Sequence, residues 1–155
     1  MSHDDAFHSL LTGGALGVLV TLKRDGRPQL STVGYDYDSG RRVIRVSVTD
    51  DRAKTRNLRR DPRASFHVSS ADGWSFVVAE CRAELGVVTE DPYDSAADEL
   101  VDYSRATGGE RAEWDEFCKT MVAERRLLVN LHVERLYGLS PEALAQWQDD
   151  RTSVS

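Results

Sequence analysis

The chain has 155 residues, a net charge of −6 and two cysteines, Cys81 and Cys118. This length suggests one domain, residues 1–155 with a core at about 10–139, that can fold without a disulfide or a metal. The cysteines lack zinc-site spacing, the acidic balance disfavours nucleic acid, and no stretch approaches the ~20 apolar residues of a membrane helix. We therefore expect a cytoplasmic protein with neither nucleic acid nor a membrane as partner.

Strand and turn signals alternate in the first part of the chain. Apolar residues at helical spacing predict a short helix over 4–11, and an apolar run predicts a buried strand over 15–23. The Asp-Gly pair at 25–26 is a hairpin signal, so residues 28–38 are expected to return as the second strand. Period-two alternation over 42–49 predicts a third strand.

The second part of the chain mixes both periodicities. Asp50 or Asp51 is expected to cap a helix over 52–60. The same patterns, with Gly and Pro breaks, then predict strands at 64–70, 74–89 and 126–139, helices at 93–106 and 111–124, and a last short helix capped by Ser140. Six antiparallel strands with inserted helices favour a small closed barrel, because closure leaves no exposed strand edges.

The segment 52–60 is the strongest local feature. It reads RAKTRNLRR, with five positive residues and no acid in an otherwise acidic chain. A helix N-terminus already favours a phosphate, and Arg52 and Lys54, with the hydroxyl of Thr55, would complete a phosphate cradle. The alternative is a solvated helix with excess arginine, and composition leaves both interpretations open.

Other chemical signals are weaker. Trp74, at the start of a strand, could lie against a planar ring or plug the core. Gln29, Ser31 and Ser47 could face the polar edge of a ring or simply face solvent. The four histidines share no spacing, and no P-loop, Rossmann or Gly-x-Ser-x-Gly motif is present, so we expect no metal site and no catalytic triad.

Four stretches of the chain together resemble a known family. They are GVLVTLKRDGRPQLSTVGY, VSVTDDRAKTRNLRRDPRAS, DGWSFVVAE and ERRLLVNLHVERLYGL. They resemble the pyridoxamine 5'-phosphate oxidase-like, FMN-binding split β-barrel family, and in particular its branch of oxidoreductases that bind coenzyme F420. The resemblance implies a mostly β fold with inserted helices, a six-stranded antiparallel split β-barrel. It also implies a homodimer with two cofactor sites in grooves at the dimer interface.

The resemblance assigns cofactor-binding roles at matching positions. The phosphate would be held by Arg52, Lys54 and Thr55, with Arg56 and Asn57 beside them. The ring and ribityl chain would be lined by Gln29, Ser31, Thr32, Val33, Ser47 and Val48. Trp74 and Ser75 would form the opposite wall, and Arg125 or Arg126 would reach the partner's site. The segment 90–113 matches least, and the outer pocket for substrate would lie there.

The implied activity is hydride transfer between reduced F420 and a small electrophilic, conjugated substrate, with the cofactor supplying the chemistry. No residue is identified as a general acid. An FMN-dependent oxidase or reductase of the same fold is one alternative, and a non-catalytic F420 carrier or sensor is another. Pyridoxamine phosphate itself is not expected as the substrate, because the matching branch is the deazaflavin one.

Overall fold

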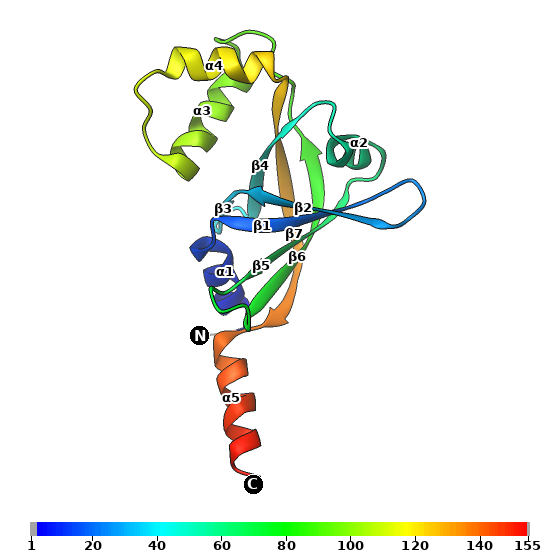
Figure 1. The fold of residues 1–155 in the computed structure, drawn as a ribbon, viewed down its shortest axis with the longest axis vertical. Coiled ribbons are helices and arrows are strands. Elements are labelled where there is room, and N and C mark those ends of the chain that lie inside the picture. The colour runs from blue at the N-terminus through cyan, green and yellow to red at the C-terminus, as the bar shows by residue number, and fades with distance from the viewer. Residues whose placement is uncertain (1–2, 155) are drawn as a thin grey trace.

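The computed structural model describes residues 3–154 (Figure 1). The helices of this part are α1 (His3–Gly13), α2 (Ala53–Arg60), α3 (Ser95–Gly108), α4 (Trp114–Ala123) and α5 (Pro141–Thr152). The strands are β1 (Leu16–Leu22), β2 (Pro28–Gly34), β3 (Asp36–Asp38), β4 (Val43–Thr49), β5 (Arg63–Ser69), β6 (Phe76–Leu85) and β7 (Arg126–Leu139).

The strands form one antiparallel sheet in the order β2-β1-β5-β6-β7-β4-β3, which curls into a half-barrel. The expectation of six strands is wrong, because the strand predicted at 28–38 is two strands with different partners. β2 pairs with β1, whereas β3 pairs with β4 at the other edge of the sheet. Between them Tyr35 is buried, and its hydroxyl donates to the backbone oxygen of Leu11. This anchor marks the point where the chain crosses from one edge to the other.

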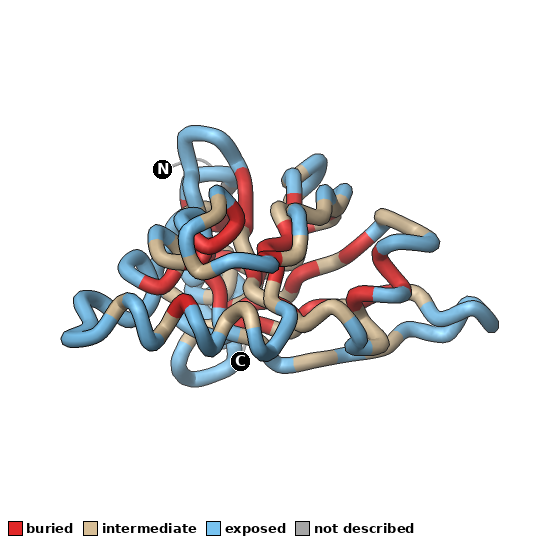
Figure 2. The backbone as a smooth tube through the Cα atoms, turned by 90° about the horizontal axis from the view of Figure 1, so that it is seen from above, coloured by how far each residue is buried: buried red, intermediate tan, exposed pale blue. Residues whose placement is uncertain are grey.

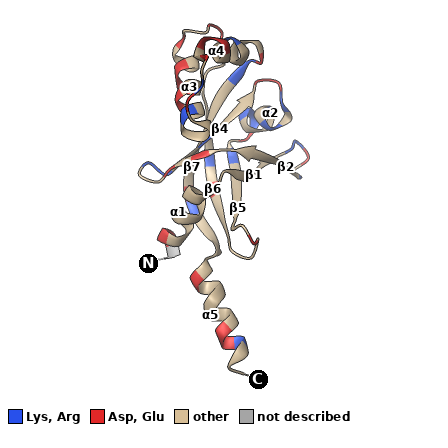
Figure 3. Cartoon of the chain, turned by 60° about the vertical axis from the view of Figure 1, so that its left-hand side comes forward, with Lys and Arg blue, Asp and Glu red and all other residues tan. Residues whose placement is uncertain are grey.

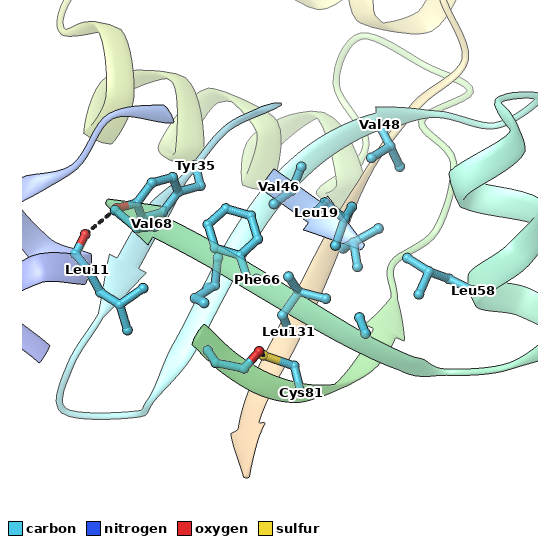
Figure 4. Packing of buried hydrophobic residues seen from close by; sticks show 14 of the residues in the cluster. Leu11, Leu19, Tyr35, Val46, Val48, Leu58, Phe66, Val68, Cys81 and Leu131 are labelled. Atoms are coloured by element: carbon cyan, nitrogen blue, oxygen red, sulfur yellow. Dashed lines mark hydrogen bonds between the residues drawn. The ribbon is translucent and has the colours of Figure 1, made fainter. Parts of the chain in front are cut away.

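The core fills the inside of the curl. Ile44, Val46 and Val48 of β4 are buried, as their alternation predicts, and they pack with Leu19 of β1 and Phe66 of β5 (Figure 4). Each such side chain contributes about 1.5–3 kcal/mol when fully buried. Figure 2 shows the buried segments inside the curl, with exposed residues on the turns around it.

The start of α2 differs from the prediction. Neither Asp50 nor Asp51 caps it; Arg52 is the N-cap and makes no side-chain cap bond. Asp50 is instead shared by Arg59 and Arg125, each of which forms an ion pair with it. Two opposite charges satisfy this carboxylate better than one cap bond would, and they lower its pKa.

Helices α3 and α4 form an insertion between β6 and β7, and α5 extends away from the sheet at the far end of the molecule (Figure 1). Ser140 caps α5 as predicted, accepting a bond from the Ala143 N–H, and no residue of α5 is buried. None of the helices found between residues 3 and 154 has the length and apolarity to cross a membrane.

Candidate functional site

The open part of the half-barrel lies between β2 and β4, which contact each other but are not neighbours in the sheet. In an antiparallel pair, backbone groups of alternate residues point at the partner strand and the others point away. The bonds from Lys23 N to Arg27 O and from Asp50 N to Arg125 O set this alternation for β1–β2 and β4–β7. On β2, the backbone groups of Leu30, Thr32 and Gly34 therefore point away from β1. On β4, those of Ser47 and Thr49 point away from β7. We call these two unpaired edges, taken together, the split; both carry backbone donors and acceptors that the sheet does not use.

Three cations meet where β4 leads into α2, and we call them the cationic cluster. Arg52 is the N-cap of α2, Lys54 lies in its first turn, and Arg126 of β7 pairs in register with Thr49 of β4. Figure 3 shows basic residues on α2. Burial, followed by the charges of Arg52 and Arg126, lowers the pKa of Lys54. Arg126 pairs with Glu124 at 2.8 Å, but within residues 3–154 no ion pair or hydrogen bond engages the side chains of Arg52 and Lys54. Two of its three cations, Arg52 and Lys54, therefore have no carboxylate partner in this part of the chain.

A buried oxygen beside the cluster also lacks a partner. Thr49 Oγ1 is inaccessible to solvent and makes no hydrogen bond, and it is the one such side-chain atom in the described part of the chain. Leaving a buried hydroxyl unsatisfied costs about 1–3 kcal/mol. The side chains of Arg52 and Lys54 and the open strand edges beside them fit a phosphate ester that carries a hydroxyl-bearing chain.

Two residues that the resemblance places at or beside the phosphate instead bond backbone oxygens at the start of α2. Thr55 is buried, and its hydroxyl donates to the backbone oxygen of Thr49 at 2.7 Å. Arg56 is exposed and donates to the backbone oxygen of Asp51 at 3.0 Å. Neither side chain belongs to the cationic cluster.

Asn57 connects α2 to the first hairpin. Its amide nitrogen donates to Gln29 Oε1 at 2.8 Å and to Thr21 Oγ1 at 3.1 Å, and its oxygen accepts from Arg60 at 3.0 Å. The structure thus brings Gln29 and Asn57 together. Because Asn57 and Thr21 are buried, this network fixes β2 against α2.

The remaining strand residues take different orientations. On β2, Ser31 and Val33 share the inner face with Gln29, and Val33 packs against the core. Thr32 alternates with them, so its side chain faces outward and its backbone faces the split. On β4, Ser47 offers its backbone to the split. The Val48 side chain is buried in the core, and its backbone pairs with β7.

Trp74 and Ser75 are not brought to the cationic cluster within one chain. They lie in the turn between β5 and β6, whereas α2 leads into the opposite end of β5 (Figure 1). The seven residues of β5 span roughly 20 Å. Trp74 is 69% exposed, so it is not a core plug, and Ser75 is buried with its N–H bonded to Ser70 Oγ.

Sequence reasoning missed Tyr103. This residue of α3 donates its hydroxyl to the Gly34 backbone oxygen at 3.1 Å, at the rim of the split. Its ring lies 5.9 Å from the guanidinium of Arg45, which also pairs with Asp36 and with Asp102 of α3 at 2.8 Å. No periodicity marks Tyr103, because only the folding of α3 onto β4 places it there.

The model of the pyridoxamine 5'-phosphate oxidase family matches residues 3–139. The chain belongs to this family. Solved structures agree with the family fold. A conserved hypothetical protein from Mycobacterium tuberculosis is 24% identical with a TM-score of 0.71, covering 94% of this chain and 88% of that one.

Two further solved structures are similar to this chain. One described as an F420 reductase is 22% identical with a TM-score of 0.63, over 84% of this chain and 95% of its own. An FAD-binding protein from Mesorhizobium loti is 18% identical with a TM-score of 0.60, over 89% and 94%. At these identities the likeness establishes the fold.

Proposed function

We propose that the chain binds coenzyme F420 in the split and acts as a reductase, with the cofactor phosphate at the cationic cluster. The observation that carries this proposal is Lys54. Its half-buried ammonium lies beside Arg52 and Arg126 and has no carboxylate partner within residues 3–154. Such an arrangement is costly for the empty protein and favourable once a phosphate is present. The F420 reductase among the similar structures supports the same assignment.

In this proposal, the residues of the chain bind the cofactor and orient it. Arg52 and Lys54 hold the phosphate, and the Asn57–Gln29 bond keeps β2 and α2 apart by a constant distance. The backbone groups of Thr32 and Ser47 bond the chain and ring that follow the phosphate. When bound, reduced F420 supplies a hydride to an electrophilic carbon of a small conjugated substrate, with solvent as the source of the proton.

A hollow beside α2 favours F420 over FMN. It has a volume of about 570 Å³ and is lined by Arg24, Ala53, Arg56, Asn57, Arg59 and Arg60. F420 carries an anionic glutamyl tail beyond its phosphate, whereas FMN ends at the phosphate. The arginines of this hollow lie beyond the cationic cluster, so they could pair with the anionic tail of F420 but not with any group of FMN. An FMN-dependent enzyme of the same fold is the second candidate, and the FAD-binding structural relative supports that candidate.

A homodimer would complete the site. The outer face of β1, β2, β6 and β7 carries apolar side chains that no element of the described chain covers fully, namely Leu16, Val18, Val20, Leu30, Val78 and Tyr137. Leu16 and Leu30 are 65% and 62% exposed. A second copy seated on this face would bury it, and would bring an exposed Trp74 to the partner's split.

Substitution of the cluster tests the proposal. Lys54→Ala and Arg52→Ala should each raise the dissociation constant for F420 about 10–100-fold, because each removes a charged hydrogen bond of roughly 1.5–3 kcal/mol. Arg63→Ala is the matched control, since Arg63 is exposed, pairs with Asp61 and lies outside both the cluster and the hollow. Isothermal titration at two salt concentrations measures this. Unchanged affinity in both cluster variants would mean that the phosphate is held elsewhere.

Parallel titrations with F420 and FMN separate the two candidates. Tighter binding of F420 supports the first, and tighter binding of FMN in the same buffer supports the second. Binding of F420 without turnover over a panel of enones and quinones would identify a carrier or sensor instead.

A further inference from the structure

Tyr103 closes the split at the end away from α2. Its hydroxyl donates to the Gly34 oxygen of β2 at 3.1 Å, and the backbone N–H of Ser47 on β4 lies close by. Burial raises the pKa of this hydroxyl, so it stays protonated and keeps its donor. One side-chain oxygen thus bonds the acceptor on one strand edge and lies near a donor on the other.

The Gly34 carbonyl and the Ser47 N–H are both groups that the sheet leaves open. Gly34 and Ser47 are at positions whose backbone points away from the paired strand. A group that serves both must donate to a carbonyl and accept from an N–H. Hydroxyls have this capacity, whereas carbonyls, ammonium groups and aromatic C–H groups do not.

The position also matches the reach of a ligand. Ser47 and Thr49 are two residues apart on β4, or about 7 Å. A chain of four or five carbons attached to a phosphate at the cationic cluster would place a hydroxyl near Ser47. The cationic cluster and the Tyr103 hydroxyl are therefore separated by roughly the length of a short polyol chain.

Tyr103 is held there by contacts that can be exchanged. Asp102 of α3 pairs with Arg45 at 2.8 Å, but its side chain is 74% exposed, and exposed pairs contribute about 1 kcal/mol or less. Moving α3 by the width of one hydroxyl would disturb this pair and leave the helix itself intact.

We propose that the backbone of Gly34 and Ser47 forms a binding subsite for a ligand hydroxyl, which Tyr103 occupies in the ligand-free protein. The ligand class is a phosphate ester with a polyol chain, so this inference rests on the proposed function and names a selective element within it. A ligand enters by exchanging its own hydroxyl for that of Tyr103. Tyr103 thereby disfavours phosphates that lack such a hydroxyl.

Tyr103→Phe removes the competing hydroxyl and keeps the ring. The dissociation constants of FMN and F420 should fall about 2- to 12-fold, the equivalent of one neutral hydrogen bond. The affinity for inorganic phosphate, measured as competition with FMN, should not change. Tyr93→Phe is the control, because Tyr93 precedes α3 and is 74% exposed; it should leave all three affinities as they are.

Hydrogen exchange gives a second readout. Saturating FMN should speed amide exchange in α3 of the wild-type protein, and Tyr103→Phe should show this faster exchange without ligand. Weaker or unchanged FMN and F420 binding in Tyr103→Phe, or protection of α3 on FMN binding, would overturn the subsite. Failure of the wild type to bind either cofactor would instead overturn the proposed function, and the subsite with it.

Discussion

Lys54 makes the empty protein less stable than it could be. Its pKa is lowered first by burial and then by Arg52 and Arg126. A lysine whose folded pKa lies below its unfolded value binds its proton more tightly when unfolded. The charged form therefore costs stability at every pH below the folded pKa, and this cost disappears as the pH rises toward the unfolded value near 10.5.

Lys54→Met should relieve this cost. At pH 7 and without cofactor we expect the melting temperature to rise by about 1–3 °C, while cofactor affinity falls. Scanning calorimetry with and without FMN measures both effects. Lys23→Met, at an exposed lysine after β1, should change neither. A lower melting temperature in ligand-free Lys54→Met would show that the ammonium has a stabilising partner.

Gly17 is a position where any side chain would disturb the core. A Cβ built there would overlap the ring of Phe66, which is fully buried and cannot move aside. Gly17→Ala should lower the free energy of unfolding by about 1–3 kcal/mol, measured by urea denaturation. Gly13→Ala is the control, because nothing lies within 4 Å of its Cβ. Equal stability of the two variants would contradict the close packing of β1 on β5.

The residues of the site were predictable to different degrees. Arg52 and Lys54 could be predicted, because a basic run after a strand is visible in the sequence. The internal role of Thr55 could not, since a hydroxyl in a first helical turn bonds either a ligand or the preceding strand, and the geometry of the β4–α2 turn decides between them. Tyr103 could not be predicted because its hydrogen-bond partner, Gly34, is 69 residues away in sequence.

At the scale of elements, α3 depends on its N-terminal cap. The Asp94 side chain accepts bonds from the N–H groups of Glu90, Asp91 and Ala97 and from the Thr89 hydroxyl. These donors lower its pKa to about 2. A depressed carboxyl pKa stabilises the fold above its unfolded value near ~3.9, and this contribution is lost as the pH falls toward 2.

Asp94→Ala should therefore destabilise α3 by about 1 kcal/mol at pH 7 and remove the acid sensitivity of this helix. Hydrogen exchange of the amides in residues 95–108, followed from pH 5 to pH 3, measures the effect. Asp98→Ala, one turn further along and exposed, is the control. Equal exchange in wild type and Asp94→Ala would mean that α3 is held by its packing alone.

Element types were more predictable than strand partners. Alternation correctly placed β4, β6 and β7, because one face of each is buried, and an apolar run between turn signals correctly placed β1. The strand predicted at 64–70 is β5. The division of 28–38 into β2 and β3 leaves no mark in the pattern, since both halves are extended. The break is created at Tyr35, whose buried hydroxyl bonds α1, a contact between segments 24 residues apart.

At the scale of the whole molecule, the outer apolar face predicts a dimer. Light scattering at micromolar concentration should give about twice the chain mass of 17.3 kDa. Leu30→Glu should shift the protein to the monomer without unfolding it, because Leu30 is exposed in the single chain and a charge at a buried interface is costly. Val87→Glu, at a residue that is 77% exposed before α3, should remain dimeric. A monomeric wild type that binds cofactor tightly would contradict a site shared between two chains.

The open split has a further consequence, for storage and handling. Unpaired strand edges are templates for pairing with other chains, and soluble proteins avoid exposing them. Here one edge carries Pro28 and the exposed Leu30, and the hydroxyl of Tyr103 bonds only the Gly34 oxygen at its end. A ligand lying along both edges would cover them, so loss of the ligand would favour aggregation before it favoured unfolding. On gentle warming, turbidity should therefore appear at a lower temperature in the cofactor-free protein than in the protein saturated with cofactor.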